Sequence, residues 1–250
     1  MLAIVSDIHA NLEALGAVFN EIDRRGITQV LCLGDIVGYG PNPVECLDLI
    51  RKRAQNTIMG NHDFAVLYEP YNFNAGAEGA CFWTRRQFEN HSPTAERTQR
   101  WKYLAGLPAR YEGGRFTAVH ASPRKPINEY IFPDDIYTNP GKFTVLFERF
   151  EKLCFVGHTH VPGVFLPGPD FYTPEELQGR FTISPDEKAI VNVGSVGQPR
   201  DRDPRSSFVI LHEGHVEFVR LEYDVETTCK KVEAVAELDD FLGARLLEGR

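Results

Sequence analysis

The segment Leu2–His9, which reads LAIVSDIH, places four apolar residues before a serine, an aspartate and a histidine. A short apolar run that ends in a polar turn is typical of a buried strand in an α/β sheet. Asp7 and His9 lie two residues apart just past this strand, so both side chains can turn toward one bound ion. Carboxylate and imidazole groups are ligands that suit a divalent cation when it activates water. This segment therefore predicts both a strand and the beginning of a metal site.

Polar residues follow five further apolar runs in the same way. They are Gly34-Asp35, Gly60–Asp63 (GNHD), Val119-His120, Gly157–His160 (GHTH) and Asn192–Ser195 (NVGS). Asp-x-His or Gly-Asp alone is common in surface turns, and GNHD alone fits a capping turn, but the ordered set of all six is far more specific. Because parallel strands end at the same edge of a sheet, we expect these residues to lie within a few ångströms of one another.

The residues between the first motifs alternate between strand and helix patterns. Apolar residues at helical spacing predict a helix over 12–25, with Gly26 at its C-cap, and a second helix over 43–52. Short apolar runs predict strands over 30–33 and 55–59. Strands that alternate with helices predict an α/β fold built on a layered sheet.

The remainder of the chain predicts a helical insertion and a change of strand pattern. We expect an insertion over about 64–107 that caps the site, with helices over 76–90 and 94–104 and a solvated His91. Strands over 115–119 and 152–156 follow, with a helix over 140–151 between them. Residues 189–193, 207–211 and 215–221 alternate like an antiparallel meander, whose last turn is Glu213-Gly214, and a charged surface helix over 227–247 ends the chain. We expect residues 1–250 to form a single domain.

Composition narrows the class of protein. A chain of 250 residues with 42% hydrophobic content can build one sizeable α/β core, and no window approaches the ~18 consecutive apolar residues of a membrane span. The formal net charge of -8 argues against tight sequence-independent binding of nucleic acid. Five cysteines without paired spacing, and an N-terminus without signal-peptide features, predict a reduced cytoplasmic protein.

The ordered motifs resemble the calcineurin-like metallophosphoesterase superfamily, from residue 1 to about residue 212, and its small bacterial and archaeal phosphodiesterase-type subgroup. The resemblance implies a four-layer α-β-β-α sandwich, in which two mixed β-sheets pack face to face with flanking helices. It also implies two divalent ions, of manganese, iron or zinc. Asp7, His9, Asp35 and His160 would hold the first ion, and Asp35, Asn61, His120 and His158 the second. A water between the ions would then attack the phosphorus of a phosphoric mono- or diester.

Five more residues are candidates for catalysis or substrate binding. His62 follows the expected ligand Asn61, so it can lean over the site and hydrogen-bond a phosphate oxygen or protonate the leaving group. Asp63 is expected to orient the His62 imidazole. In the last motif block, Arg200 and Asn192 are candidates for substrate contact, and Tyr39 could stack on a substrate base or simply pack.

The substrate and the class of function remain open at this point. Small members of the subgroup resemble phosphodiesterases, dinucleoside polyphosphate hydrolases or serine/threonine protein phosphatases, and we expect a small phosphorylated substrate. A non-catalytic metal-bound interaction scaffold is the alternative from another class, and the intact motif set with His62 argues against it. A nuclease would share the chemistry, but the acidic chain has no basic groove. Nothing in the sequence predicts the oligomeric state.

Overall fold

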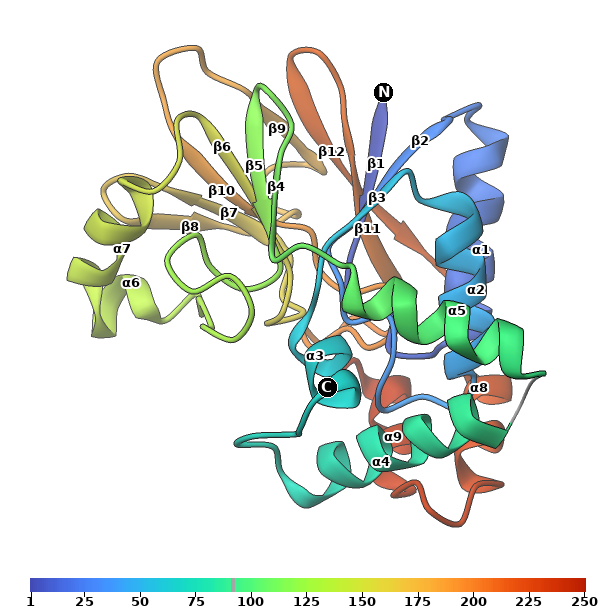
Figure 1. Ribbon diagram of the computed structural model, residues 1–250. Helices are drawn as coiled ribbons and strands as arrows, with labels where there is room; N and C mark the ends of the chain where they lie inside the picture. The colour runs from blue at the N-terminus through green and yellow to red at the C-terminus, as the bar shows by residue number, and fades with distance from the viewer. Residues whose placement is uncertain (91–92) are drawn as a thin grey trace.

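Two β-sheets form the centre of the computed structural model, which describes residues 1–90 and 93–250 (Figure 1). The expectation for His91 lies outside the described residues. In this part of the chain, the first sheet has six strands in the order β3-β2-β1-β11-β12-β9. These strands are β1 (Leu2–Val5), β2 (Gln29–Cys32), β3 (Asn56–Thr57), β9 (Arg180–Thr182), β11 (Ser206–Leu211) and β12 (His215–Leu221).

The second sheet also has six strands among the described residues, in the order β4-β5-β6-β10-β7-β8. They are β4 (Arg110–Glu112), β5 (Phe116–Val119), β6 (Leu153–Val156), β7 (Gly163–Leu166), β8 (Asp170–Tyr172) and β10 (Ala189–Asn192). Both sheets are mixed. Strands β1, β2 and β3 run parallel in the first, and β5, β6 and β10 run parallel in the second, while antiparallel strands complete each sheet.

Alternation along the strands sorts apolar side chains into three layers. In β1, Ile4 faces the second sheet, whereas Ala3 and Val5 face the helices, because successive side chains of a strand point to opposite faces. Residues such as Phe116, Phe155 and Val209 fill the space between the sheets. The predicted four-layer sandwich of two mixed sheets with flanking helices is confirmed.

Helices cover the outer face of each sheet (Figure 1). On the first sheet lie α1 (Leu12–Arg24) and α2 (Pro43–Arg53), and on the second lie α6 (Asp135–Thr138) and α7 (Pro140–Phe147). The amide N–H of Ala14 donates to the side chain of Asn11 at the start of α1, and Gly26, with φ of +65°, follows its end. The predicted helices over 12–25 and 43–52 are therefore present.

The segment between β3 and β4 is helical, as predicted. It contains α3 (Asn61–Leu67), α4 (Ala75–Asn90) and α5 (Thr94–Ala105). Helix α3 was not predicted, and it begins at Asn61 itself, directly after β3. The sequence pattern also missed β4, β7, β8, β9 and α6, which have only three or four residues each.

Two predicted elements differ in the structure. The helix expected over 140–151 ends at Phe147. Strand β10 belongs to the second sheet and runs parallel to β6, so it is not part of a meander with β11 and β12. Only β11 and β12 form the predicted hairpin, with Glu213 and Gly214 between His212 and His215. Alternation cannot reveal the sheet to which a strand belongs, because β10 is buried on both faces.

The expected surface helix over 227–247 is also wrong. The chain forms α8 (Val225–Glu233), α9 (Phe241–Ala244) and a 3₁₀ helix η1 (Arg245–Glu248). Val232, Leu238 and Leu242 are buried in one cluster with Trp83 of α4 and with Tyr39. The apolar side chains of this acidic, charged segment therefore bring the C-terminal residues against α4 and the loop after β2. Within residues 1–90 and 93–250, no helix combines the length and apolar character needed to cross a membrane.

The interior between the sheets predicts the cost of a core substitution. Phe155 is fully buried there, and its ring lies 5.3 Å from that of Phe116 in an edge-to-face contact. We expect Phe155→Ala to lower the free energy of unfolding by about 3–5 kcal/mol, measured by urea denaturation. Tyr137→Ala, at a side chain that is 81% exposed, is the control and should change it by less than about 0.5 kcal/mol. Equal stability of the two variants would contradict this description of the core.

Candidate metal centre

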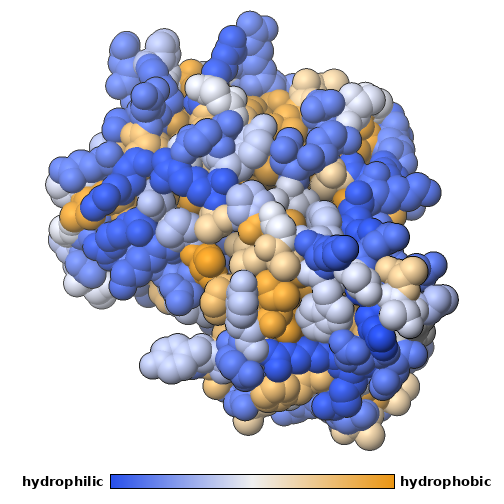
Figure 2. All heavy atoms as spheres, viewed as in Figure 1, coloured by the Kyte–Doolittle hydropathy of each residue, from blue (hydrophilic) through white to orange (hydrophobic). Residues whose placement is uncertain are grey.

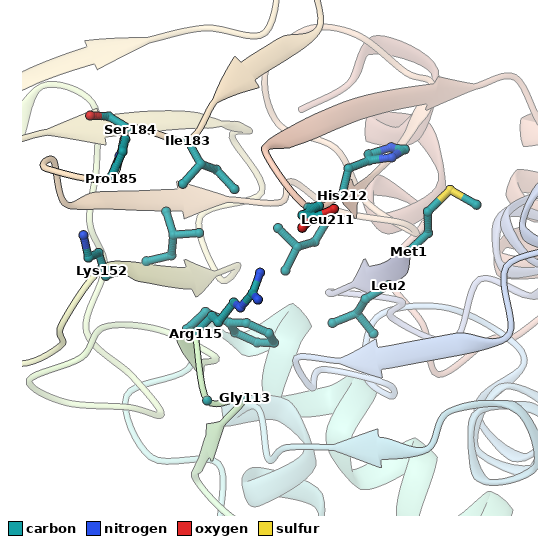
Figure 3. A pocket seen from close by; sticks show the side chains of 14 residues that line it. Met1, Leu2, Gly113, Arg115, Lys152, Ile183, Ser184, Pro185, Leu211 and His212 are labelled. Atoms are coloured by element: carbon teal, nitrogen blue, oxygen red, sulfur yellow. The ribbon is translucent and has the colours of Figure 1, made fainter.

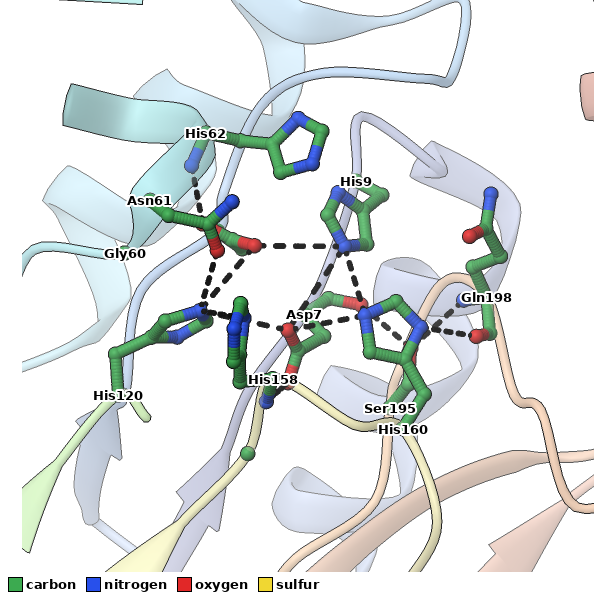
Figure 4. Close-up of polar contacts among 12 residues, drawn as sticks. Asp7, His9, Gly60, Asn61, His62, His120, His158, His160, Ser195 and Gln198 are labelled. Atoms are coloured by element: carbon green, nitrogen blue, oxygen red, sulfur yellow. Dashed lines mark hydrogen bonds and ion pairs between the residues drawn. The ribbon is translucent and has the colours of Figure 1, made fainter. Parts of the chain in front are cut away.

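The predicted ligands gather at one end of the sandwich, where parallel strands of both sheets end (Figure 4). Asp7 and His9 follow β1, Asp35 follows β2 and Asn61 follows β3, all in the first sheet. His120 follows β5, and His158 and His160 follow β6, both in the second sheet. The expected convergence is thus present, but it joins the edges of two sheets rather than the edge of one.

One group of ligand atoms surrounds the carboxylate of Asp7. His160 Nε2 lies 3.2 Å from Asp7 Oδ1, and His9 Nε2 lies 3.1 Å from His160 Nε2. His9 Nε2 also lies 3.8 Å from Asp7 Oδ1 and 3.7 Å from Asp35 Oδ2. Asp7, His9 and His160 are all buried. Their ligand atoms lie within 4.8 Å of one another, as a shared cation requires.

A second group surrounds His120. Its Nε2 atom lies 3.3 Å from Asp35 Oδ2, 3.0 Å from Asn61 Oδ1 and 3.2 Å from His158 Nδ1. Asp35 Oδ2 therefore contacts both groups, since it lies within 4 Å of an imidazole nitrogen in each. This is the arrangement expected of a carboxylate that two cations share.

Hydrogen bonds at Nδ1 of three imidazoles hold a proton on that nitrogen and orient Nε2 toward the centre. Nδ1 of His9, His120 and His160 faces the carbonyl oxygens of Val37, Leu33 and Gln198, at 3.2, 3.0 and 2.5 Å. A carbonyl oxygen only accepts, so each Nδ1 carries a proton. Burial lowers the pKa of His9 and of His160, so Nε2 of these two neutral rings presents a lone pair. Against the effect of burial, Asp35 raises the pKa of His120 to about 9, so its Nε2 carries a proton that a bound cation would replace. Backbone carbonyls commonly orient metal-ligating histidines in this way.

These lone pairs point at one another and at carboxylate oxygens. His9 Nε2 faces His160 Nε2, and Asp7 Oδ1 is buried without a hydrogen-bond donor among the described residues. Acceptors that face each other in a dry site repel unless a proton or cation lies between them. The donor set therefore fits divalent cations bound by oxygen and imidazole.

The electrostatics of the centre also favour cations. Burial raises the pKa of Asp7, but attraction to His160 and His120 outweighs burial and brings it to about 2. Burial and the neighbouring imidazoles hold the pKa of His9 and of His158 well below the usual range. Asp7 is thus ionised and these two histidines are neutral near pH 7, which are the states in which they bind metals.

Comparison with known proteins agrees with this geometry. A family model described as a calcineurin-like phosphoesterase superfamily domain matches residues 1–215. The chain belongs to the calcineurin-like phosphoesterase superfamily. An uncharacterised protein of Methanocaldococcus jannaschii is 38% identical over 262 residues, covering 100% of this chain and 98% of that protein.

Two solved structures share the whole fold. A metallophosphoesterase from Sphaerobacter thermophilus is 38% identical, covers 100% of this chain and 99% of its own, and superposes with a TM-score of 0.82. A hypothetical protein from Pyrococcus horikoshii is 19% identical, covers 100% and 98%, and gives a TM-score of 0.74, which shows the fold alone. Membership in this metal-dependent superfamily supports a phosphoesterase that uses its Asp and His groups to bind metals.

Strain marks the loops that carry these phosphoesterase motifs. Asp7, His9, Asp35, His158 and His160 all have φ between 48° and 65°, a left-handed conformation that residues with a Cβ seldom adopt. Each such residue costs about 1 kcal/mol or more, so the surrounding contacts must impose it. Strain of this kind clusters at functional sites, and five of the ten described non-glycine residues with positive φ are predicted ligands.

His62 lies beside the centre, as the sequence suggested. Its ring centroid is 4.8 Å from that of His9, 4.4 Å from that of Tyr39 and 4.6 Å from that of Phe73. Its backbone N–H donates to Asp35 Oδ1 at 2.7 Å. Burial lowers the pKa of His62 to about 4, so the free protein holds a neutral imidazole that can donate an N–H group.

Two expectations need correction. The carboxylate of Asp63 accepts hydrogen bonds from the backbone N–H groups of Asp35, Ile36 and Gly60, so it braces the loop of a ligand instead of orienting His62. Asn192 is fully buried, and its side-chain amide bonds Gly157 O, Thr159 Oγ1 and Gly194 N. Asn192 therefore holds the loop after β6 and has no free group for a substrate.

Tyr39 and Arg200 lie on the rim. The Arg200 guanidinium is 5.7 Å from the Tyr39 ring centroid and donates to Gln198 Oε1 at 2.6 Å. Sequence reasoning missed a second cation, Arg245 of η1. Burial and the charge of nearby Arg200 lower its pKa to about 10, and its Nε atom donates to Arg250 O. Nothing in the sequence pattern indicated that Arg245 lies near Arg200, because Arg245 is far in sequence from every motif.

A cavity of about 810 Å³ lies at the end of the sandwich opposite the predicted ligands (Figure 3). The N-terminal ends of β1, β5 and β6 contribute Leu2, Phe116 and Leu153 to its wall. None of the motif residues lines it, so its size carries no argument about the phosphoesterase centre.

A substitution at Gly157 tests the centre without replacing any predicted ligand. A Cβ at this position would lie 2.3 Å from Asp7 Oδ2 and 2.2 Å from Ser6 Oγ, so Asp7 would have to move. We expect Gly157→Ala to weaken binding of Mn²⁺ by about 10–100-fold, as other disturbances of groups that orient ligands do, measured by calorimetric titration of metal-free protein. Gly141→Ala, where nothing lies within 4 Å, should leave the affinity unchanged. Unaltered affinity in Gly157→Ala would contradict the site.

Proposed function

We propose that this protein hydrolyses phosphoric mono- or diesters of small molecules with two divalent cations, bound by Asp7, His9, Asp35, Asn61, His120, His158 and His160. The observation that carries the proposal is the position of Asp35 Oδ2 between the two ligand groups, 3.7 Å from His9 Nε2 and 3.3 Å from His120 Nε2. Manganese, iron and zinc all suit such oxygen and imidazole ligands.

The cations, when bound, would supply a Lewis acid for the phosphoryl oxygens and a water of lowered pKa. The protein's own residues then set the geometry. Asp35 is held by its backbone N–H to Asp63 at 2.8 Å and by its Oδ1 atom to the His62 N–H, so its Oδ2 atom stays directed at both groups. Hydrogen bonds from His158 N and Ser195 Oγ hold Asp7 in a similar way, at 3.0 and 2.8 Å. A preorganised site of this kind needs little rearrangement when charge develops.

His62 is the proposed catalytic residue that does not bind metal. It lines a cavity of about 210 Å³ together with the ligands Asn61 and His158. A neutral imidazole in that wall can donate a hydrogen bond to a phosphoryl oxygen or to the departing oxygen. Arg200, with Arg245 beside it, is the proposed partner for a further anionic group of the substrate.

The size of the cavity supports a small substrate. A volume of about 210 Å³ accommodates part of a metabolite, and α4 and the segment before it form one of its walls. This favours a small ester over a folded phosphoprotein, and so over a serine/threonine protein phosphatase. A dinucleoside polyphosphate remains within the proposed class.

We further propose that residues 1–250 act as one domain, and that the protein is cytoplasmic. The first point is supported by the packing of Leu242 and Val232 against Tyr39, which joins the C-terminal helices to the motif loops. The second is supported by the five cysteines of the sequence, all of which are described, unpaired and buried.

Asp35→Asn tests the shared carboxylate. The substitution keeps the size of the side chain but removes the charge that both groups use, so we expect Mn²⁺-dependent hydrolysis of bis-p-nitrophenyl phosphate and p-nitrophenyl phosphate to fall by about 1,000-fold or more. Asp134→Asn, at an exposed carboxylate, is the matched control and should retain full activity. Absence of turnover in the metal-loaded natural protein would instead favour an interaction scaffold.

His62→Asn tests the catalytic histidine separately from the metals. We expect kcat to fall by about 10²–10⁴-fold while the metal content, measured by elemental analysis, stays that of the natural protein. A retained kcat would show that His62 only packs against Tyr39 and Phe73. A loss of metal in parallel with activity would show that it supports the ligands instead.

A further inference from the structure

The cavity of about 810 Å³ opposite the metal centre lies at the open end of the core between the sheets (Figure 3). Leu2 and Leu211 of the first sheet and Phe116 and Leu153 of the second line it, and all four lie in or against the cluster that fills the space between the sheets. Leu2, Leu211 and the neighbouring Ile183 are only partly buried, so solvent reaches part of this apolar wall. A ligand in the cavity would cover apolar surface of both sheets at once.

Turns with fixed backbones surround the cavity. Gly113 N donates to Phe116 O at 2.8 Å in the turn between β4 and β5, and a Cβ at Gly113 would lie 2.5 Å from the Phe116 ring. Ile183 N donates to Gly214 O at 3.0 Å, which joins the segment after β9 to the turn between β11 and β12. Hydrophobic and hydrophilic residues lie side by side at this end of the molecule, at the top of the space-filling view (Figure 2). Walls that are ordered before binding lose little conformational entropy when a ligand enters.

Two cationic side chains, those of Arg115 and Lys152, also line the cavity. They directly precede Phe116 and Leu153, which are paired in the parallel strands β5 and β6, so the two cations lie at the ends of neighbouring strands. Both are exposed, and neither pairs with a carboxylate in the described part of the chain. Figure 3 shows the Arg115 side chain directed inward, between Lys152 and Leu2. Like charges on neighbouring strands repel each other, and a bound anion would relieve this repulsion.

The charge at the cavity differs in sign from that of the whole chain. The formal net charge is -8, but the ionised groups that line the cavity are Arg115, Lys152 and a single carboxylate, that of the exposed Glu213. His212 also lines the cavity, and its Nε2 atom lies 3.1 Å from Glu217 Oε2. A local excess of positive charge attracts anions even to an acidic protein.

We propose that this cavity binds a small amphipathic carboxylate, whose alkyl chain lies against the wall formed by both sheets and whose carboxylate pairs with Arg115 and Lys152. The volume of about 810 Å³ is in the range of cavities that hold small molecules. Guanidinium and ammonium groups form strong, charge-assisted hydrogen bonds with a carboxylate. A neutral apolar molecule would leave the two cations unpaired, whereas a small inorganic anion would leave the apolar wall exposed to water.

A second copy of the chain is the competing occupant of an apolar opening. Most dimers have two-fold symmetry, so the patch would meet itself and bring Arg115 and Lys152 of one copy toward the same cations of the other. Glu213 is the one lining carboxylate that could compensate them. Charge therefore favours an anionic small molecule over self-association.

Calorimetric titration of the full-length protein with hexanoate, octanoate, decanoate and 1-octanol tests both parts of the site. We expect the affinity to rise by up to about tenfold for every two methylene groups, because the wall removes them from water. Octanoate should bind about tenfold more tightly than 1-octanol, which has the same chain length but no charge for the two cations. Equal affinities of octanoate and 1-octanol, or affinities that do not depend on chain length, would overturn the proposal.

Substitutions assign the binding to this cavity. Arg115→Gln and Lys152→Gln together should remove most of the preference for octanoate over 1-octanol, and Ile183→Asn should reduce the gain in affinity per methylene group. Lys230→Gln, at a side chain that is 74% exposed on α8 and lies outside the cavity, is the control and should change neither quantity. Each quantity is a ratio of affinities within one variant, so a general loss of stability affects both ligands alike. A preference for octanoate that persists without both cations would place the carboxylate elsewhere and overturn the proposal.

Two further measurements separate this site from the metal centre and from self-association. Arg115→Gln should hydrolyse p-nitrophenyl phosphate as the natural protein does, so the failure of either proposal leaves the other standing. Sedimentation measures the oligomeric state with and without octanoate. A dimer that Ile183→Asn dissociates, in a protein that does not bind octanoate, would show that a second copy occupies the cavity.

Discussion

The carboxylate of Asp35 is the constraint on which the rest of the centre depends. Its Oδ2 atom lies between His9 and His120, which belong to different sheets, while its Oδ1 atom is occupied by the N–H of His62. The strands of both sheets must therefore end close to one another, so that the two imidazoles can reach one oxygen. The core of aliphatic and aromatic side chains between the sheets fixes the distance from one sheet to the other. The geometry of the centre therefore depends on how tightly the sandwich packs.

Several ligand atoms of the centre are acceptors that face one another, among them Nε2 of His9 and of His160 and Oδ1 of Asp7. Backbone carbonyls accept hydrogen bonds from the Nδ1–H groups of three histidines. Loops in left-handed conformations present the carboxylates and the remaining imidazole nitrogens inward. Such an arrangement stores unfavourable electrostatic and backbone energy that the binding of cations would relieve. This explains why Asp63, Asn192 and Ser195, which bind backbone groups, are as much a part of the site as the ligands.

Three structural units meet over the centre and define what can enter it. The segment before α4 contributes Tyr71 and Asn72, the loop after β5 contributes Tyr130, and the C-terminal helices bring Arg245 toward Arg200. Arg245 lies beyond residue 215, where the matched family region ends, in a C-terminal segment that the relatives covering the whole chain also span. The strand ends supply the predicted ligands, whereas these other segments lie around them.

The sequence alone determined the strands that carry the motifs, the helices over 12–25 and 43–52, and the seven residues that meet at the centre. These features are local, because an apolar run followed by a polar turn specifies a strand and its end. Only the tertiary structure decided that β10 pairs with β6, that Asp63 holds Asp35 and not His62, and that the C-terminal segment folds back against Tyr39. The physical reason is that strand partners and hydrogen bonds between distant loops depend on which surfaces pack together. The stacking of Tyr130 on His158, two residues from separate loops, is of the same kind.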